Sequence, residues 1–410
     1  MKFTVATYGT EGDTRPLAAL CIALRAAGHQ THLLADAATL ASARSAGIPA
    51  TPLSGDIRQA LAPGQALAAA VDRKGGFGQT TRALAAIANA NVMDWMREIE
   101  AAAVDADALV VSGLAAFAGL SVGESLDIPV IGAGLIPISP TRAFASPFLP
   151  PALVPGMLNR FSHRAVNGLL WRAFRHTTNA ARARVLALPP RQRVWTDHPM
   201  LYGVSPTLLP QPADWPDNAR MCGQWELPAP AWTPPAALAD FLAAGEPPIY
   251  IGFGSMAGFD RQRLAQVMID AVGGRRTLFH PGWSGVDAGM LPDNFFIVGD
   301  TPHAWLFPRT AMAVHHGGSG TSHSAVRAGI PSVVVPFAGD QPFWADRLHR
   351  LGIADRPVNG TRLEAKALGR AIAFADRRDV RARAAELGGR MAAEDGTGVA
   401  IAAIEQLLSI

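Results

Sequence analysis

A glycine-rich stretch carries the strongest chemical signal in this sequence. It reads Val314-His315-His316-Gly317-Gly318-Ser319-Gly320-Thr321. The apolar run 311–314 predicts a short buried strand, and residues 322–329 predict a helix that ends at a glycine. Backbone N–H groups at such a turn, together with the positive end of the helix dipole, bind phosphate. The competing interpretation is an ordinary tight turn with two surface histidines.

Asp13 is a second residue whose position suggests chemistry. It lies in the stretch 9–16, between a β-prone run at 3–8 and a predicted helix at 17–27. An ordinary Asp has a pKa near 3.9, so its carboxylate is ionised at neutral pH and can accept a proton. The competing role is to cap the helix that follows.

Asp340 and Gln341 follow a predicted strand at 332–336. A carboxylate beside an amide offers the acceptors and donors that adjacent sugar hydroxyls need. The alternative is a plain turn dipeptide.

We expect no metal site. Asp105-Ala106-Asp107 is typical of a solvated helix end. His315, His316 and His323 lack an acid or a cysteine that would complete a cluster.

The composition predicts a globular protein. A chain of 410 residues that is 49% hydrophobic and 17% charged is expected to form two or three domains. Cys21 and Cys222 lie far apart and form no metal or redox spacing, which favours a reduced, cytoplasmic setting. The longest apolar run, at 108–123, is too short to span a membrane, so we expect the chain to be soluble.

The net charge of +3 hides an asymmetry, because residues 128–196 contain nine Arg and no Asp or Glu. No nucleic-acid motif accompanies this basic segment, so we expect no nucleic-acid partner. A helix in the Arg-rich segment 157–193 would carry arginines on one side and apolar residues nearer the other, namely Arg160, Arg164, Arg172 and Arg175 against Leu158, Phe161 and Leu169. Peripheral contact with an anionic membrane and an ordinary solvated arginine face both stay open.

Two βαβ patterns must position these residues. Strands are predicted at 3–8, 30–35, 109–112, 129–133 and 201–204, and again at 249–253, 277–280, 295–298, 312–315 and 332–336. Ligands bind at the carboxyl ends of parallel strands, so the pattern favours two doubly wound, Rossmann-like α/β domains facing an interdomain cleft. We expect domains at 1–220 and 246–392, a proline-rich linker at 221–245, and a terminal helix within 393–410.

Four motifs in this order resemble the GT-B glycosyltransferases, in the UDP-glycosyltransferase family that includes sterol glucosyltransferases and bacterial natural-product glycosyltransferases. The first three are Gly9-Thr10-x-Gly12-Asp13-x-x-Pro16 with Gly28-His29, Gly252-Phe253-Gly254-Ser255-Met256, and Pro302-His303-x-Trp305-Leu306-Phe307-Pro308-Arg309. The fourth is the glycine-rich stretch, which continues through Ala328-Gly329-x-Pro331 to Pro336-Phe337-x-Gly339-Asp340-Gln341-Pro342-Phe343-Trp344. The resemblance spans nearly the whole chain and is thinnest between residues 51 and 199.

The resemblance implies roles for these parts. Domain 1–220 would bind an acceptor, domain 246–392 would bind a nucleotide sugar, and the final helix would cross back to the first domain. Asp13 occupies the position of the catalytic base. The donor-binding residues would be His316, Gly318, Ser319, Gly320 and Thr321 for the diphosphate, Asp340 and Gln341 for the sugar, Ser255 for the nucleotide, and Pro302 and His303 around the base.

The implied reaction is metal-independent, inverting transfer of a hexose to a hydroxyl of a lipophilic small molecule, of sterol, terpenoid, polyketide or phenolic type. We expect glucose as the sugar and a UDP-sugar in preference to a dTDP-sugar. Many UDP-using relatives carry a Glu eight residues after the phosphate His, where this sequence has Ser324. The nucleotide therefore stays open.

An apolar loop predicts the acceptor site. Residues 132–149 carry Ile136, Phe144 and Phe148 among prolines, which suits the wall of a pocket, and Phe77 would add to it. Ordinary core packing is the alternative for each of them. A different function class also stays open, since nucleotide-sugar 2-epimerases share the two-domain plan.

Overall fold

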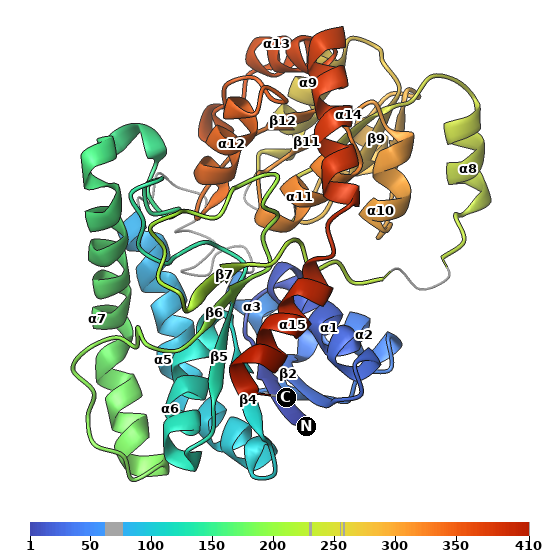
Figure 1. Ribbon diagram of the computed structural model, residues 1–410. Coiled ribbons are helices and arrows are strands. Elements are labelled where there is room, and N and C mark those ends of the chain that lie inside the picture. Colours follow the sequence, from blue (N-terminus) through green and yellow to red (C-terminus); the bar gives the residue numbers. More distant parts are fainter. Residues whose placement is uncertain (62–76, 229–231, 255, 257–258, 410) are drawn as a thin grey trace. The chain divides into compact units, whose positions relative to one another are not determined.

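The computed structural model describes residues 1–61, 77–228, 232–254, 256 and 259–409 (Figure 1). These residues form two compact units. Residues 1–61, 77–228 and 395–409 make unit 1, and residues 232–394 make unit 2. Each unit is built around one parallel β-sheet, which is the architecture that the alternating strand and helix signals predict.

Unit 1 contains a seven-stranded parallel sheet in the order β3-β2-β1-β4-β5-β6-β7. The strands are β1 (Lys2–Ala6), β2 (Gln30–Asp36), β3 (Ala50–Leu53), β4 (Ala108–Val111), β5 (Val130–Gly134), β6 (Met200–Tyr202) and β7 (Ala219–Met221). The side chains of β1 point to opposite faces of the sheet. Phe3 and Val5 belong to the buried cluster on one face, and Ala6 belongs to the cluster on the other. Both faces of the sheet are therefore covered.

The helices of unit 1 supply these two cores. They are α1 (Glu11–Ala26), α2 (Ala41–Ser45), α3 (Ile57–Leu61), α5 (Phe77–Ala103), α6 (Ala116–Leu126), α7 (Asn159–Val185) and α15 (Gly396–Leu408). Leu17, Leu20 and Leu24 of α1 lie in the first core, whereas Val92 and Trp95 of α5 lie in the second.

Helix α15 joins the first core of unit 1 from the far end of the chain. Ile404 is fully buried there, and α15 lies against α1. The Trp225 indole N–H donates a 3.1 Å hydrogen bond to the carbonyl of Gly396, at the start of α15. A Cβ at Gly396 would come within 2.4 Å of the Gln224 carbonyl oxygen, so this contact requires glycine.

Unit 2 contains a five-stranded parallel sheet in the order β10-β9-β8-β11-β12. Its strands are β8 (Ile249–Gly252), β9 (Thr277–His280), β10 (Phe295–Ile297), β11 (Met312–His315) and β12 (Ser332–Val334). Its helices are α8 (Ala236–Ala243), α9 (Arg261–Val272), α10 (His303–Leu306), α11 (Ser319–Arg327), α12 (Gln341–Arg350), α13 (Ala365–Ala375) and α14 (Arg378–Ala392).

Two edge strands and part of the expected linker differ from the sequence prediction. The edge strands β3 and β7 were not expected, because β3 has an exposed Pro52 and β7 is only three residues long. Part of the expected linker 221–245 is structured: Trp225 is buried in unit 1, and α8 places Leu238 in a core of unit 2. Among the described residues, no helix has the length and apolarity to cross a membrane.

Candidate functional site

The glycine-rich turn lies at the point where the strand order of unit 2 reverses. Strand β8 pairs with β9 on one side and with β11 on the other. Ligands of doubly wound sheets bind at this position, beyond the carboxyl ends of the strands. The segments after β8 and β11 meet there, since a Cβ at Gly254 would be 3.1 Å from the Cε1 atom of His316.

Helix α11 begins within the glycine-rich turn. Gly318 is its N-cap and Ser319 its first residue, three residues earlier than the sequence predicts. Ser319, Gly320 and Thr321 therefore form the first turn, whose N–H groups have no carbonyl partners within the helix. The positive end of the helix dipole lies at the same turn, so the geometry suits a phosphate.

Gly317 shapes the turn. Its φ of +88° is in the left-handed region, and a Cβ there would be 2.7 Å from Val334 Cγ1. Both observations require glycine at this position.

The two histidines before the turn have different roles. His315 is fully buried, and its Nδ1 accepts a 3.1 Å hydrogen bond from the Gly317 N–H. His316 lies against Gly318, where a Cβ would be 2.4 Å from His316 Nε2. Burial lowers the pKa of His316 to about 4, so this imidazole is neutral at pH 7. It can therefore act toward a phosphate as a neutral N–H donor.

The side chains of Asp340 and Gln341 both have structural partners. The Gln341 Oε1 atom accepts hydrogen bonds from the backbone N–H groups of Phe337 and Ala338, at 2.7 and 3.1 Å. Asp340 Oδ2 accepts a 2.8 Å bond from the Trp344 indole N–H. Both side chains therefore make the local hydrogen bonds that the turn interpretation expects, and their role in sugar binding remains a prediction.

Pro302 and His303 lie at the start of α10, after β10. Pro302 is the N-cap, and the His303 ring stacks on Phe307 with centroids 4.2 Å apart. The expected nucleotide contact Ser255 lies outside the described residues.

The sequence predicts Asp13 in a loop before the helix, but the structure places it in the first turn of α1. Helix α1 begins at Glu11, and Thr10 is its N-cap. Asp13 Oδ2 accepts bonds from the Thr10 N–H at 2.7 Å and from the Thr10 hydroxyl at 3.3 Å. This is a capping box, and the Thr-x-x-Asp spacing was the signal that sequence analysis missed.

The Asp13 carboxyl has an unusual pKa. Burial raises it to about 6, although the two bonds from Thr10 act in the opposite direction. Strand β1 leads into this segment at the reversal point of the unit 1 sheet, between β1 and β4. A carboxylate with a pKa near 6 is still mostly ionised at pH 7 and is a stronger base than an ordinary Asp.

The expected acceptor loop is a described segment of unit 1. Ile136, Phe144 and Phe148 are each partly buried, and the Phe144 ring lies edge-on to His163 of α7. The His163 imidazole also bonds the Phe144 carbonyl oxygen through Nε2 at 3.1 Å. His163 was not singled out from the sequence, because a lone His on a helix gives no signal. The side chain of Phe77 lies outside the described residues.

Within the described residues, no group of three or more His, Cys, Asp and Glu side chains has the arrangement of a metal site. His323 donates from Nδ1 to the Ser319 carbonyl at 2.7 Å. In the Asp105-Ala106-Asp107 motif, Asp107 Oδ2 accepts a 2.7 Å bond from the N–H of Lys2 and so fixes the start of β1.

Comparison with known proteins identifies the family. The family model for the C-terminal domain of erythromycin biosynthesis protein CIII-like proteins matches residues 278–406. Sterol 3-beta-glucosyltransferase UGT80B1 of Arabidopsis thaliana is 30% identical over 429 residues, covering 100% of this chain and 68% of the relative. The chain belongs to the GT-B glycosyltransferase family of the sterol 3-beta-glucosyltransferases.

Other members of this family are longer. The sterol 3-beta-glucosyltransferase of Emericella nidulans is 32% identical over 98% of this chain, which spans only 30% of that relative's length. Among solved structures, the glycosyltransferase VinC in complex with dTDP has a TM-score of 0.68 at 17% identity, with 100% of both chains covered. That likeness is one of fold, and it confirms the predicted GT-B architecture.

Proposed function

We propose that this protein is a metal-independent, inverting glycosyltransferase that moves glucose from UDP-glucose to a hydroxyl of a lipophilic small molecule. The observation that carries the proposal is the first turn of α11 with neutral His316 beside it, at the reversal point of the sheet. Likeness to sterol 3-beta-glucosyltransferases over 98–100% of this chain supports the substrate class and the sugar.

Glycosyl transfer needs a base, and we assign that role to Asp13. Its carboxylate takes the proton of the acceptor hydroxyl as the acceptor oxygen forms a bond to the anomeric carbon. The bond from that carbon to the diphosphate oxygen breaks, and the leaving nucleoside diphosphate keeps the electron pair. Attack from the face opposite the leaving group inverts the anomeric configuration.

The leaving diphosphate gains negative charge, which the α11 turn can stabilise. Backbone N–H groups of Ser319, Gly320 and Thr321, with the helix dipole, are preorganised donors that need no rearrangement during the reaction. Removing one such donor typically costs about 2.7–4 kcal/mol of barrier in other enzymes. This arrangement is why we propose catalysis without a metal ion.

The donor choice rests on the curated relatives, whose names specify glucosyl transfer. Ser324, partly buried on α11, replaces the ribose-binding Glu of many UDP-using relatives. Thermal-shift titrations with UDP, dTDP and GDP decide between nucleotides. A larger stabilisation by dTDP than by UDP would overturn the UDP assignment and leave the transferase proposal intact.

The test of the reaction combines UDP-glucose with a panel of sterol, terpenoid, polyketide and phenolic acceptors. We expect a β-linked glucoside and stoichiometric UDP. Asp13→Asn is expected to lower turnover by about 10²–10⁴-fold while UDP binding is retained. Glu11→Gln is the matched control, because Glu11 is in the same helical turn but its carboxylate accepts a bond from Ser42.

Full turnover by Asp13→Asn would remove Asp13 from the mechanism. An incubation with UDP-glucose and no acceptor tests the 2-epimerase alternative in the same experiment. An epimerised nucleotide sugar in place of a glucoside would overturn the proposed reaction.

A further inference from the structure

Exposed apolar side chains gather at the start of α7. Ten large hydrophobic residues are exposed in the described part of the chain, and half of them lie between residues 153 and 169. Met157 is 91% exposed and Phe161 is 66% exposed. Two short 3-10 turns, Pro151–Leu153 and Gly156–Leu158, lead into the helix and carry Leu153, Met157 and Leu158, whereas Phe161 and Leu169 lie on α7 itself. Exposed apolar clusters of this kind mark interaction surfaces.

The exposed side of α7 mixes apolar and basic residues, which corrects the sequence prediction. Phe161 and Leu169 are exposed together with Arg164, Arg172 and Arg175, and do not lie on an opposite face. Arg160 is partly buried instead. The buried side of α7 is formed by a different set of residues, namely Asn159, His163, Val166, Phe174, Thr178, Ala181 and Arg182.

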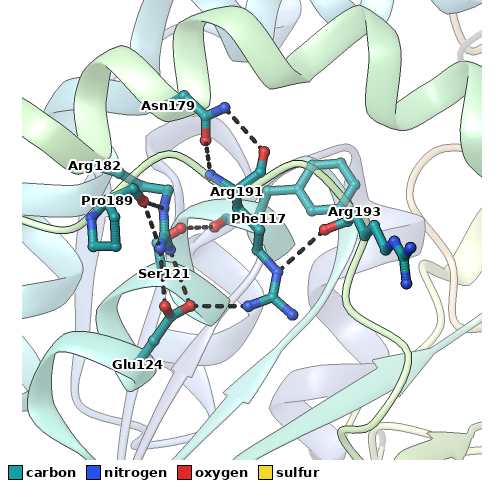
Figure 2. A network of polar contacts seen from close by, with 8 residues as sticks. All are labelled: Phe117, Ser121, Glu124, Asn179, Arg182, Pro189, Arg191 and Arg193. Atoms are coloured by element: carbon teal, nitrogen blue, oxygen red, sulfur yellow. Dashed lines mark hydrogen bonds and ion pairs between the residues drawn. The ribbon is translucent and has the colours of Figure 1, made fainter.

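Two arginines of the basic segment have structural roles and do not contribute to this surface. Figure 2 shows Arg182 and Arg191 both directed at Glu124 of α6. Arg182 is almost fully buried and also donates to the Pro189 carbonyl. By contrast, no ion pair to Arg164, Arg172 or Arg175 occurs in the described part of the chain.

A basic cavity lies beside the exposed side of α7. It has a volume of about 430 Å³ and is bounded by α7 and residues 192–196. Arg172, Arg175 and Arg193 line it, and no acidic residue does. A space lined by three guanidinium groups suits a phosphate-bearing headgroup, because Arg binds phosphate oxygens through two N–H groups at once.

The buried side of the same helix holds the expected acceptor loop. Asn159 Nδ2 donates to the Arg142 carbonyl at 2.9 Å, and Asn167 Nδ2 donates to the Ile138 carbonyl at 3.2 Å. The pKa of His163 is lowered by burial, so its neutral imidazole donates through one nitrogen, Nε2, to the Phe144 carbonyl, and its Nδ1 lies 3.3 Å from the Ile138 carbonyl oxygen. The loop and the exposed surface are therefore opposite sides of one helical segment.

We propose that the α7 surface, comprising Leu153, Met157, Phe161, Arg164, Arg172 and Arg175, binds the surface of an anionic lipid bilayer. The apolar side chains enter the boundary between headgroups and acyl chains, and the arginines contact headgroup phosphates. The helix lies in the plane of the interface: from Phe161 to Arg175 it runs about 21 Å at 1.5 Å per residue.

Charge and shape favour a bilayer over a protein or a nucleic acid. Residues 128–196 carry no acidic side chain, so the surface is complementary to a uniformly anionic partner. Nucleic acids are also uniformly anionic, but the exposed Met157 and Phe161 do not form a platform on which bases stack. A lipid interface, by contrast, accepts apolar and basic groups side by side. A docked α7 would hold the acceptor loop about one helix diameter, roughly 10 Å, from the bilayer and so near a membrane-dissolved acceptor, and this last statement rests on the proposed function.

The test is co-flotation of the full chain with vesicles, in the absence of donor and acceptor, so its result is independent of catalysis. We expect binding to phosphatidylcholine vesicles that contain 30% phosphatidylglycerol in a low-salt buffer, and release when salt is raised well above physiological strength. The triple variant Arg164→Gln/Arg172→Gln/Arg175→Gln should bind about 100-fold more weakly, at roughly fivefold for each arginine.

Two matched controls distinguish binding through this surface from an effect of net charge and from nonspecific hydrophobic binding. Arg362→Gln/Arg378→Gln/Arg390→Gln removes the same charge from exposed positions of unit 2 and should bind like the unaltered protein. Met157→Ser/Phe161→Ser should weaken binding at least tenfold, whereas Val104→Ser, at a residue 70% exposed elsewhere in unit 1, should not.

Three outcomes would overturn the proposal: no flotation with anionic vesicles at low salt, equal loss of binding in both triple variants, or binding that is competed away by single-stranded DNA. Thermal unfolding of each variant verifies that weaker binding does not come from misfolding. Self-association of the chain through this surface, measured by sedimentation, would also contradict it.

Discussion

At the scale of single residues, Asp13 has the capping role that the sequence offered as an alternative, and the proposed mechanism gives it the role of base as well. Its Oδ2 atom closes the capping box of α1 through Thr10, which fixes the carboxylate in one orientation. We expect the other oxygen, Oδ1, to take the acceptor proton. In the proposed mechanism the capping contact therefore orients the base, so that one side chain serves both the helix start and the proton transfer.

The raised pKa of Asp13 predicts the acid limb of the pH profile. The base works when deprotonated, so kcat/KM should fall about tenfold per pH unit below pH 6, where Asp13 becomes protonated. His316, with a pKa of about 4, stays neutral across this range.

Thr10→Val provides a directional check on this assignment. It removes the hydroxyl bond that lowers the pKa of Asp13, so the limb should move to higher pH. A limb near pH 4 that Thr10→Val leaves in place would contradict Asp13 as the titrating group.

Residue types were easier to predict from sequence than side-chain directions. The Gly-rich turn was identified because glycine at φ near +88° has few alternatives. The partners of Gln341 and the exposure of Phe161 were not identified, because both depend on tertiary contacts. Sequence periodicity indicated an arginine-bearing helix but placed its apolar residues on the wrong side.

At the scale of elements, the start of α11 offers a sharp test of the diphosphate site. A Cβ at Gly318 would be 2.4 Å from His316 Nε2, so Gly318→Ala should displace that imidazole. Loss of a hydrogen bond to a charged group costs about 1.5–3 kcal/mol, so UDP affinity should fall roughly 10–100-fold. Calorimetric titration with UDP measures the change.

Gly320→Ala is the control for that substitution. A Cβ at Gly320 would meet no heavy atom within 4 Å, and Gly320 has an ordinary helical backbone conformation. The substitution should therefore leave the position of His316 unchanged. Similar UDP affinities for both variants would mean that His316 does not contact the diphosphate.

The contact between α6 and α7 depends on one buried charge (Figure 2). Glu124→Ala leaves the almost fully buried Arg182 guanidinium without its carboxylate partner, which should cost about 3 kcal/mol of unfolding free energy. Arg182 lowers the pKa of Glu124, so the stabilisation is present at neutral pH and is lost on acidification through the lowered pKa.

Asp94→Ala is the comparison, because the Asp94–Arg97 pair is exposed and should contribute under about 0.5 kcal/mol. Urea unfolding at pH 7 measures both variants. Equal effects of the two substitutions would indicate that the Arg182 contact with Pro189 is sufficient by itself.

Elements with strong apolar runs were predicted well, and short or capped ones were not. Strands such as β4 and β11 are buried on both faces and are continuous apolar segments in the sequence. The helix predicted at 17–27 begins earlier in the structure, because Thr10 caps α1 one residue before Glu11. Local hydrogen bonding between Thr10 and Asp13 sets this helix start.

At the scale of the whole molecule, unit 1 is completed by the end of the chain. Ile404 of α15 is fully buried among residues from α1 and the sheet. Ile404→Ala should lower the free energy of unfolding of unit 1 by about 2–5 kcal/mol. Hydrogen exchange should rise in β1 and α1 and stay unchanged in β11, since the latter belongs to unit 2.

Leu407→Ala is the matched substitution, because Leu407 is partly exposed on the same helix and should change stability little. A rise in exchange confined to α15 itself, without β1, would show that the helix is not part of the unit 1 core.

The return of α15 to unit 1 has a consequence for the ribosome-bound chain. Residues 395–409 are synthesised only after all of unit 2, so the first 228 residues leave the ribosome with one face of α1 uncovered. At ordinary rates of translation that face waits on the order of 10–30 s for its partner. During this interval we expect the nascent N-terminal unit to expose an apolar surface of the kind that chaperones bind and that aggregates in their absence.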